Sequence, residues 1–152
     1  MECVLTKRDR QLLKSAEKLV KRWRKHLQLD PLWDIGVEIV DDDEMEGAIA
    51  RVDTSNSEYF VATIEITNGL LHLPEDKFLS TMNELVCHEL IHLVMIDFFR
   101  TAQLAAGEEE TLNRELRYKF EQFTSRFQHA FIELDKQLIK AKENEVRTGE
   151  GP

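Results

Sequence analysis

Apolar residues recur along the chain with two different periods, and each change of period predicts a change of element. Between residues 6 and 29 they return every three or four positions, which is the spacing of one helical face. Thr6 followed by Asp9 resembles a capping box at the start of this helix, and Asp30-Pro31 ends it because a residue before proline avoids the helical region. The segment is therefore expected to be an amphipathic helix with one apolar face, made by Leu12, Ala16, Leu19, Trp23 and Leu27.

The middle of the chain alternates apolar and polar residues with the two-residue period of half-buried strands. One such run covers residues 33–39 and a clearer one covers residues 58–67, with a short strand expected at 48–52 between them. The acidic stretch 41–46 lacks the ligand spacing and the glycine of an EF-hand loop, so we interpret it as a solvated turn and not as a calcium site. Asn68-Gly69 predicts a turn after the last strand.

Helical spacing returns after residue 74. Pro74 and Glu75 suit the first turn of a helix, which is expected to run to about Phe99. Gly107 predicts a break, and a long helix is expected over residues 108–145. Its apolar stripe is formed by Leu112, Leu116, Phe120, Phe123, Phe127, Phe131, Leu134 and Leu138.

The order helix, two or three strands, helix, helix predicts an α+β fold without a βαβ repeat. We expect an N-terminal helix, a small and mostly antiparallel sheet, and two C-terminal helices. The 152 residues suffice for one domain with its own core and are too few for two ordinary domains. A single domain is therefore expected over residues 1–146, with a flexible tail at residues 147–152.

The net charge of −9 is unevenly distributed. Residues 31–110 hold 18 acidic and three basic residues, whereas residues 1–30 hold nine basic and four acidic ones. An acidic middle repels nucleic-acid phosphates and suits cations. Binding of nucleic acid by the basic first helix is therefore the weakest of the hypotheses on function.

Few sequence features bear on the cellular compartment. No apolar run reaches the roughly 18 residues of a membrane-spanning helix, and the N-terminus has no apolar stretch of signal-peptide length. Two cysteines, Cys3 and Cys87, cannot make a disulfide scaffold. We expect a cytoplasmic protein without a membrane partner, in which Cys87 is a buried small residue and Cys3 has no role.

One motif carries chemistry: His88-Glu89-Leu90-Ile91-His92, an HExxH pattern within the helix that begins near residue 74. Residues four apart share a helical face, so both imidazoles can reach one cation, and Glu89 can contact a water bound to it. Two imidazoles with one carboxylate make a tetrahedral zinc site that keeps one position open. The motif predicts one Zn²⁺ bound by His88 and His92, with Glu89 as general base. The alternative is a helix whose histidines only satisfy hydrogen bonds in the core.

The third zinc ligand is sought among the glutamates at the start of the last helix, which are Glu108, Glu109, Glu110 and Glu115. With about 100° per residue, Glu109 lies about 20° from Leu116 and falls inside the apolar stripe, whereas the other three lie about 80° or more away. A carboxylate on the inward face can meet the metal. Glu109 is therefore the preferred ligand, with Glu108 and Glu115 next.

The remaining histidines are weaker candidates for the metal. His129 lies about 30 Å from Glu109 along a continuous helix, so the two cannot share an ion. His26 and His72 stay open as ligands, although no spacing argument supports either.

The stretch from Trp33 to about Phe127 resembles the small HExxH metallopeptidase-like proteins of phages and bacteria. It is also similar in plan to the ImmA/IrrE-type minimal zinc peptidases of the gluzincin group. The matching residues are Trp33-Asp34-Ile35, the run from Tyr59 to Ile64, the HExxH motif and the Glu-rich start of the last helix. This resemblance implies a zincin-like domain with zinc bound by His88, His92 and a downstream glutamate, and with Glu89 as general base. It also implies a sheet whose edge strand lies along the active cleft.

The sequence thus predicts a zinc-dependent peptidase with a peptide or protein substrate. The alternative is a non-catalytic metal-binding module of phage or bacterial origin, with a regulatory or peptide-binding role. We expect a substrate to add along the strand 58–67, because an exposed edge strand offers unpaired backbone groups. Tyr59 would then face the cleft and donate to the oxyanion, and the alternative is a tyrosine that packs on the sheet.

Overall fold

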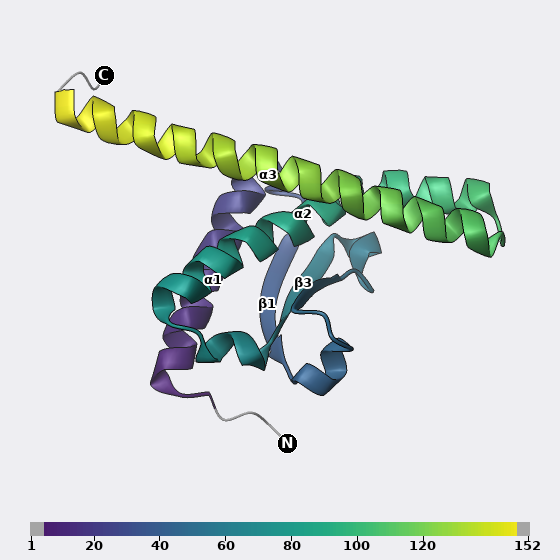
Figure 1. Ribbon diagram of the computed structural model, residues 1–152, viewed down its shortest axis with the longest axis horizontal. Helices are drawn as coiled ribbons and strands as arrows, with labels where there is room; N and C mark the ends of the chain where they lie inside the picture. Colours follow the sequence, from purple (N-terminus) through teal and green to yellow (C-terminus); the bar gives the residue numbers. More distant parts are fainter. Residues whose placement is uncertain (1–4, 149–152) are drawn as a thin grey trace.

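The computed structural model describes residues 5–148, with side chains up to residue 144. Its main elements, in chain order, are α1 (Lys7–His26), β1 (Asp34–Val40), β2 (Ala50–Asp53), β3 (Val61–Thr67), α2 (Glu75–Ala106) and α3 (Glu110–Thr148). Short 3-10 helices occupy residues 42–45, 57–59 and 68–72. Figure 1 shows α1 and α2 packed beside the small sheet, with α3 running along α2 and projecting beyond it at its C-terminal end. The α+β class and the expected order of elements are confirmed.

The first helix is fixed at its start by the capping box that the sequence predicts. The Thr6 hydroxyl accepts a hydrogen bond from the Asp9 backbone N–H, and the Asp9 carboxylate accepts one from the Thr6 N–H. This exchange satisfies two backbone donors that a helix start otherwise leaves unpaired. The apolar face of α1 is buried in the core at Leu12, Ala16, Val20 and Trp23.

A polar network joins α1 to both later helices. The Asn83 side-chain oxygen in α2 accepts hydrogen bonds from the Arg22 guanidinium at 2.6 Å and from the Trp23 indole at 2.9 Å. Arg22 also lies 3.1 Å from the buried carboxylate of Asp135 in α3. The network fixes the position of α3 along its own axis relative to α1 and α2. This position determines which residues of α3 lie near His88 and His92.

The sheet is mixed and has the strand order β1-β3-β2. β1 pairs in parallel with β3 along its whole length. β2 pairs antiparallel with β3 over a shorter run, from Ala50 opposite Ile66 to Asp53 opposite Thr63. The expected antiparallel pairing therefore holds for β2 and β3, while the longer ladder is parallel. The parallel ladder places the start of β1 beside the start of β3.

Residues 58–67 do not form an exposed edge strand, and that expectation is wrong. Residues 57–59 form a 3-10 helix, and β3 begins at Val61 with hydrogen-bonded neighbours on both sides. Ala62, Ile64 and Ile66 are buried beneath the helices. The strand with the most apolar face contributes most to stability at the centre of the sheet, where that face is buried. There the neighbouring strands also satisfy the backbone hydrogen-bonding groups on both of its edges. The edge strands are therefore β1 and β2.

The hairpin of α2 and α3 turns at Gly107. The first part of α2 is fully buried at Phe78, Met82, Val86 and Leu90, and the helix then continues to Ala106, past the expected end near Phe99. Gly107 has φ 63° and ψ −141°, a region that only glycine adopts at low cost. Its carbonyl accepts a hydrogen bond from the Asn113 side chain at 2.9 Å, which ties the turn to the first part of α3.

The apolar stripe of α3 faces the rest of the protein only in part, contrary to the expectation from the sequence: Phe120 stacks on Phe99 of α2 and Phe131 packs against the core. The residues of α3 that are buried are instead Thr124, Ile132 and Asp135. Phe123 and Phe127, in the middle of the stripe, remain 48% and 39% exposed. With about 100° per residue, the buried face lies roughly 100° around the helix from the stripe.

The expected tail at residues 147–152 falls largely outside the described residues. Helix α3 continues to Thr148, and residues 149–152 and Cys3 lie outside the described part. Within the described part, no helix is long and apolar enough to cross a membrane.

Candidate metal centre

Helix α2 directs two imidazoles toward one point. His88 and His92 lie four residues apart, with ring centroids 4.8 Å from each other. Their side chains keep 20% and 16% of their surface exposed, while Leu90 and Ile91 between them are buried in the core. The pair is thus presented to an open cavity by a helix that is firmly packed on its other side.

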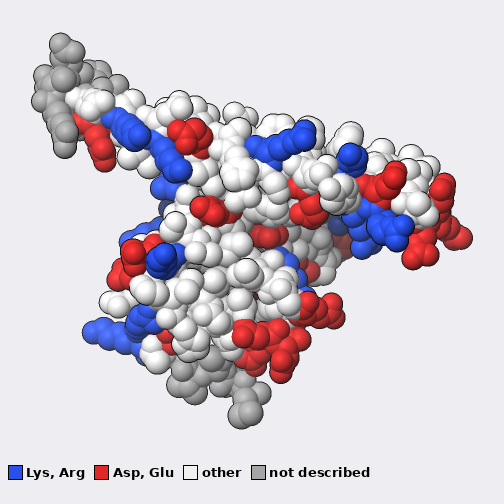
Figure 2. Space-filling view, in the orientation of Figure 1, with Lys and Arg blue, Asp and Glu red and all other residues white. Residues whose placement is uncertain are grey.

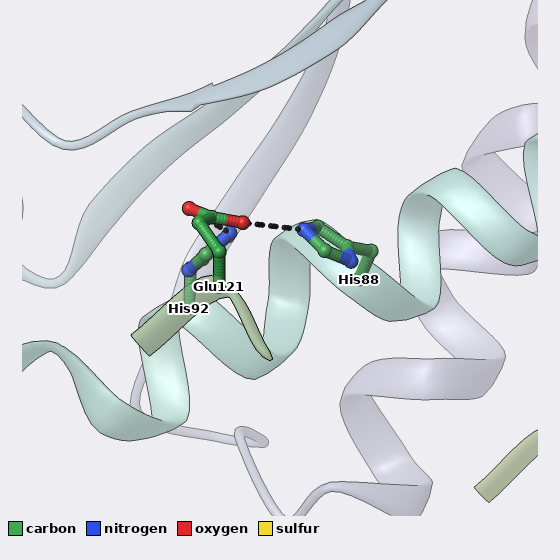
Figure 3. Close-up of side chains that lie close together, drawn as sticks. All are labelled: His88, His92 and Glu121. Carbon is green, nitrogen blue, oxygen red and sulfur yellow. Dashed lines mark hydrogen bonds and ion pairs between the residues drawn. The ribbon is translucent and has the colours of Figure 1, made fainter. Parts of the chain in front are cut away.

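A carboxylate from α3 completes the group. Glu121 places one oxygen 3.3 Å from His88 Nε2 and the other 3.5 Å from His92 Nε2, as Figure 3 shows. One potential ligand atom from each residue lies within 4.8 Å of the others. In a tetrahedral site with metal–ligand bonds of about 2.0–2.1 Å, ligand atoms are about 3.3 Å apart. The donor set and its spacing therefore fit a zinc ion, and this is the one such group among the described side chains.

Glu109, the ligand preferred from the sequence, is not brought to the histidines. It stands exposed just before α3, twelve residues ahead of Glu121, which corresponds to about 18 Å along the helix. The choice failed because a different face of α3, which carries Glu121 and Gln128, is turned toward the histidines. It also failed because α2 continues for fourteen residues after His92, so α3 needs a similar number to return to the level of the site.

The other sequence candidates also lie away from the metal centre. Glu108, Glu110 and Glu115 are exposed near the hairpin turn. His26 lies 3.5 Å from Asp135 in the network that joins α1 to α3, and His72 belongs to the 3-10 helix before α2. A signal for Glu121 was present in the sequence, since it lies nearly as far after Gly107 as His92 lies before it.

A glutamine that the sequence reasoning missed fixes the orientation of His88. The Gln128 amide nitrogen donates to the Glu84 carbonyl at 3.2 Å, so its oxygen is directed toward His88 Nδ1 at 3.0 Å. His88 Nδ1 therefore carries the hydrogen, and Nε2 keeps its lone pair for a metal. Such partners of metal-binding histidines set the tautomer and the ring orientation.

Replacing Gln128 with leucine is expected to weaken zinc binding by about 10- to 100-fold. The variant loses the acceptor for His88 Nδ1–H, so the ring is free to rotate and to change tautomer. Competition with a coloured zinc chelator measures the dissociation constant. Gln122→Leu, on the same helix, serves as the matched control and should bind zinc as the wild type does. Equal affinities of all three proteins would contradict this role of Gln128.

Glu89 is buried beside the histidines and directed toward the edge strand β2. The pKa of its carboxyl group is raised to about 7, mainly by burial and also by the nearby Glu121 carboxylate, while His88 and a hydrogen bond from the Val52 backbone N–H act in the opposite direction. Burial also lowers the pKa of His92, which favours the neutral imidazole that a metal requires. The site thus holds a proton-accepting group that can change its charge near neutral pH.

In the metal-free protein, Glu89→Gln is expected to increase stability more at pH 8 than at pH 5. The folded pKa of about 7 exceeds the ordinary value of 4.5, so the folded protein binds this proton more tightly than the unfolded chain. The free energy of unfolding therefore falls as pH rises between the two values, by an amount on the order of 3 kcal/mol above pH 7. Glutamine carries no charge and avoids this loss.

Urea unfolding in the presence of a chelator, repeated between pH 5 and pH 8, measures this difference. Glu84→Gln, an exposed glutamate on the same helix, should follow the wild type at each pH. A stabilisation by Glu89→Gln that is the same at pH 5 and pH 8 would contradict the raised pKa.

The metal centre opens into a cavity of about 480 Å³ between β2, α2 and α3. Besides the four site residues, it is lined by Ala50, Arg51, Val52, Phe99, Arg117 and Phe120. Tyr59 is 72% exposed and does not line this cavity. Cys87 is fully buried, as expected, and burial raises the pKa of its thiol to about 12.

Comparisons of the chain with models of known protein families, with curated proteins and with solved structures find no match. The evidence on function is therefore the chemistry of the metal centre itself.

Proposed function

We propose that this protein is a zinc-dependent peptidase of the minimal gluzincin type, acting on a peptide or protein substrate in the cytoplasm. One observation carries the proposal: His88 Nε2, His92 Nε2 and the Glu121 carboxylate converge on one point next to the buried Glu89. Two imidazoles and one carboxylate with an accessible fourth side are the ligand set of catalytic zinc in peptidases. A bound zinc ion would polarise the substrate carbonyl and lower the pKa of a coordinated water to about 7.

Glu89 has the properties of the general base. Its carboxyl group is buried, follows His88 directly and has a pKa raised to about 7, which is near the value at which a base works best in neutral solution. The hydrogen bond from the Val52 N–H holds the carboxylate at the side of the cavity. Glu89 would accept a proton from the attacking water and pass it to the amine that leaves.

The substrate would lie along β2, and not along β3 as the sequence suggested. β2 is an edge strand of the sheet, and its residues Ala50, Arg51 and Val52 line the cavity. Alternate residues of an edge strand direct their N–H and C=O groups away from the sheet, so an extended peptide can pair with them. A peptide in this position passes directly in front of His88 and His92.

Arg117 is the residue best placed to stabilise the oxyanion. It lies on α3 one turn before Glu121 and lines the same cavity. Within the described residues it makes no hydrogen bond or ion pair, whereas Arg51 in the cavity is engaged by Glu65. A guanidinium group with free donors can bind the oxygen that becomes negative during hydrolysis.

Arg117→Ala is expected to lower kcat/KM by about 100-fold without changing zinc affinity. The variant removes a donor that acts mainly in the transition state, so the loss should fall on kcat more than on KM. Steady-state kinetics on a fluorogenic peptide give both constants. Arg114→Ala, three residues earlier and outside the cavity, should retain wild-type kinetics, and an unchanged kcat for Arg117→Ala would refute this role.

The proposed function is tested by metal analysis together with a peptide-hydrolysis assay. We expect one zinc per chain, cleavage of at least one member of a mixed peptide library, loss of cleavage with a chelator, and recovery when zinc is added. Zinc binding without cleavage of any peptide would reject the peptidase and favour the non-catalytic metal-binding module. Absence of zinc binding would reject both.

A further inference from the structure

Much of the apolar stripe of α3 has no partner helix within the described part of the protein, although Phe120 stacks on Phe99 of α2 and Phe131 packs against the core. From Leu116 to Leu134 its residues recur at spacings of three or four, which is the pattern of a helix packed along another helix. Yet Phe123, Phe127 and Leu134 leave 48%, 39% and 51% of their surface exposed. The pattern therefore indicates a contact that one copy of the chain does not make by itself.

An apolar groove continues this surface onto α2. It has a volume of about 430 Å³ and lies between the second half of α2 and the first half of α3. Phe98 and Phe99 line one side, and Leu116, Phe120 and Phe123 line the other. The last part of α3, after the buried Asp135, projects past the domain as a bare helix, as Figure 1 shows. One copy thus offers both a groove for a helix and a free helical segment.

The exposed apolar area is close to what a stable interface needs. Apart from Tyr118 and Ile139, which lie on other faces of α3, eight large apolar side chains of the α2–α3 hairpin are more than one-third exposed, namely Val94, Phe98, Leu104, Leu112, Phe123, Phe127, Leu134 and Leu138. With roughly 150 Å² for each such side chain when fully exposed, they offer on the order of 600 Å². A stable interface buries about 800 Å² per partner, including its polar rim.

Two stretches of the chain, one at the start of α3 and one in its second half, carry opposite charges. Residues 108–115 contain four glutamates and one arginine, whereas residues 136–142 contain three lysines and no acidic residue. Between these stretches, uncharged surface covers much of α3 on the face that Figure 2 shows. A second α3 placed antiparallel would bring each acidic stretch against a basic stretch, while a parallel one would oppose like charges.

We propose that the α2–α3 hairpin binds a second copy of the chain, with the two α3 helices antiparallel about a two-fold axis near residue 125. In this register the stripe matches itself, because Leu112 faces Leu138, Leu116 faces Leu134 and Phe123 faces Phe127 of the other copy. The segment of each α3 between Phe127 and Leu134 lies against the groove of the other copy. Each contact occurs twice, as a two-fold interface requires.

The charged residues set the direction of this pairing. Glu108 and Glu110 of one copy lie at the same level along the helix axis as Lys142 and Lys140 of the other, at the borders of the interface. The proposal does not depend on the metal centre or on peptidase activity, since His88 and His92 belong to α2 and Glu121 lies outside the apolar stripe of α3.

Sedimentation of the full chain over a wide concentration range tests the interface. We expect a species of twice 17.8 kDa for the wild type. The double variant Phe123→Glu/Phe127→Glu should raise the dimer dissociation constant by about 100-fold or more, because both side chains lie at the centre of the contact. The matched control Leu32→Glu/Ile49→Glu changes two apolar residues that are 64% and 53% exposed elsewhere, and it should remain dimeric. Circular dichroism verifies that both variants fold.

Charge reversal tests the antiparallel register. Lys140→Glu/Lys142→Glu should weaken the dimer, and adding Glu108→Lys/Glu110→Lys in the same chain should restore it. A wild-type monomer at every concentration would overturn the proposal and leave the groove to another partner. A dimer that survives Phe123→Glu/Phe127→Glu would place the interface elsewhere, and failure of the added lysines to restore the dimer would overturn the antiparallel alignment.

Discussion

Glu89→Gln is expected to lower kcat/KM for peptide hydrolysis by about 10³-fold or more while zinc stays bound. The amide has nearly the same shape as the carboxylate but cannot accept the proton of the attacking water. Glu89 is not one of the three converging ligands, so the metal should be retained. The loss should appear in kcat, because the side chain acts on the reacting water and not on the binding of the peptide.

Parallel measurements of hydrolysis and zinc content separate these two effects. Glu84→Gln, one turn before His88 and exposed to solvent, is the matched control and should keep both wild-type activity and one zinc per chain. An active Glu89→Gln protein would contradict the assignment of the general base. Loss of zinc from the variant would instead show that Glu89 belongs to the metal ligands.

Glu121→Ala is expected to weaken zinc binding by about 100-fold or more, since it removes one of three ligands and the negative charge beside the cation. The stabilisation of the folded protein by zinc should fall with it, because a ligand bound only by the folded state adds RT ln(1 + [L]/Kd) to the free energy of unfolding. For a 100-fold change in Kd at saturating zinc, this loss is about 2.7 kcal/mol. Thermal unfolding at several zinc concentrations measures it.

Two alanine variants provide controls for the Glu121 experiment. Glu109→Ala and Glu115→Ala remove exposed glutamates outside the metal centre and should bind zinc as the wild type does. If Glu109→Ala lost zinc while Glu121→Ala kept it, the hairpin in solution would differ in register from the structure. The assignment of His88 and His92 as zinc ligands would not be affected.

Local features of this fold were predictable from the sequence because short-range chemistry determines them. The capping box of Thr6 and Asp9 depends on residues three apart, and the shared face of His88 and His92 depends only on helical geometry. The glycine at the hairpin turn was also predictable, because its positive φ excludes most other residues at low cost. Each of these features needs no knowledge of what packs against the element.

Features that depend on packing between distant elements were not predictable in the same way. The apolar stripe of α3 suggested that Glu109 faces inward, because we assumed that the most apolar face of a helix is covered by its own chain. The polar contacts of Gln128 with α2 and of Asp135 with α1 turn a different face of α3 toward the domain. The place of β3 at the centre of the sheet likewise depends on β1, which pairs in parallel with β3 along the edge of β3 opposite to β2.

The geometry of the metal centre does not depend on the length of the two arms of the α2–α3 hairpin, which are the part of α2 after His92 and the part of α3 before Glu121. Residues 93–120 supply no metal ligand and lead away from the site and back to it, with Phe99, Arg117 and Phe120 lining the cavity, since His92 and Glu121 meet at the same level. Inserting about seven residues, or two turns, into each arm would leave that level unchanged, whereas one residue in a single arm would rotate Glu121 by about 100° and displace it by about 1.5 Å. Chains built on this plan are therefore expected to keep the HExxH motif and the glutamate at widely different separations. A search pattern of fixed length would miss most of them.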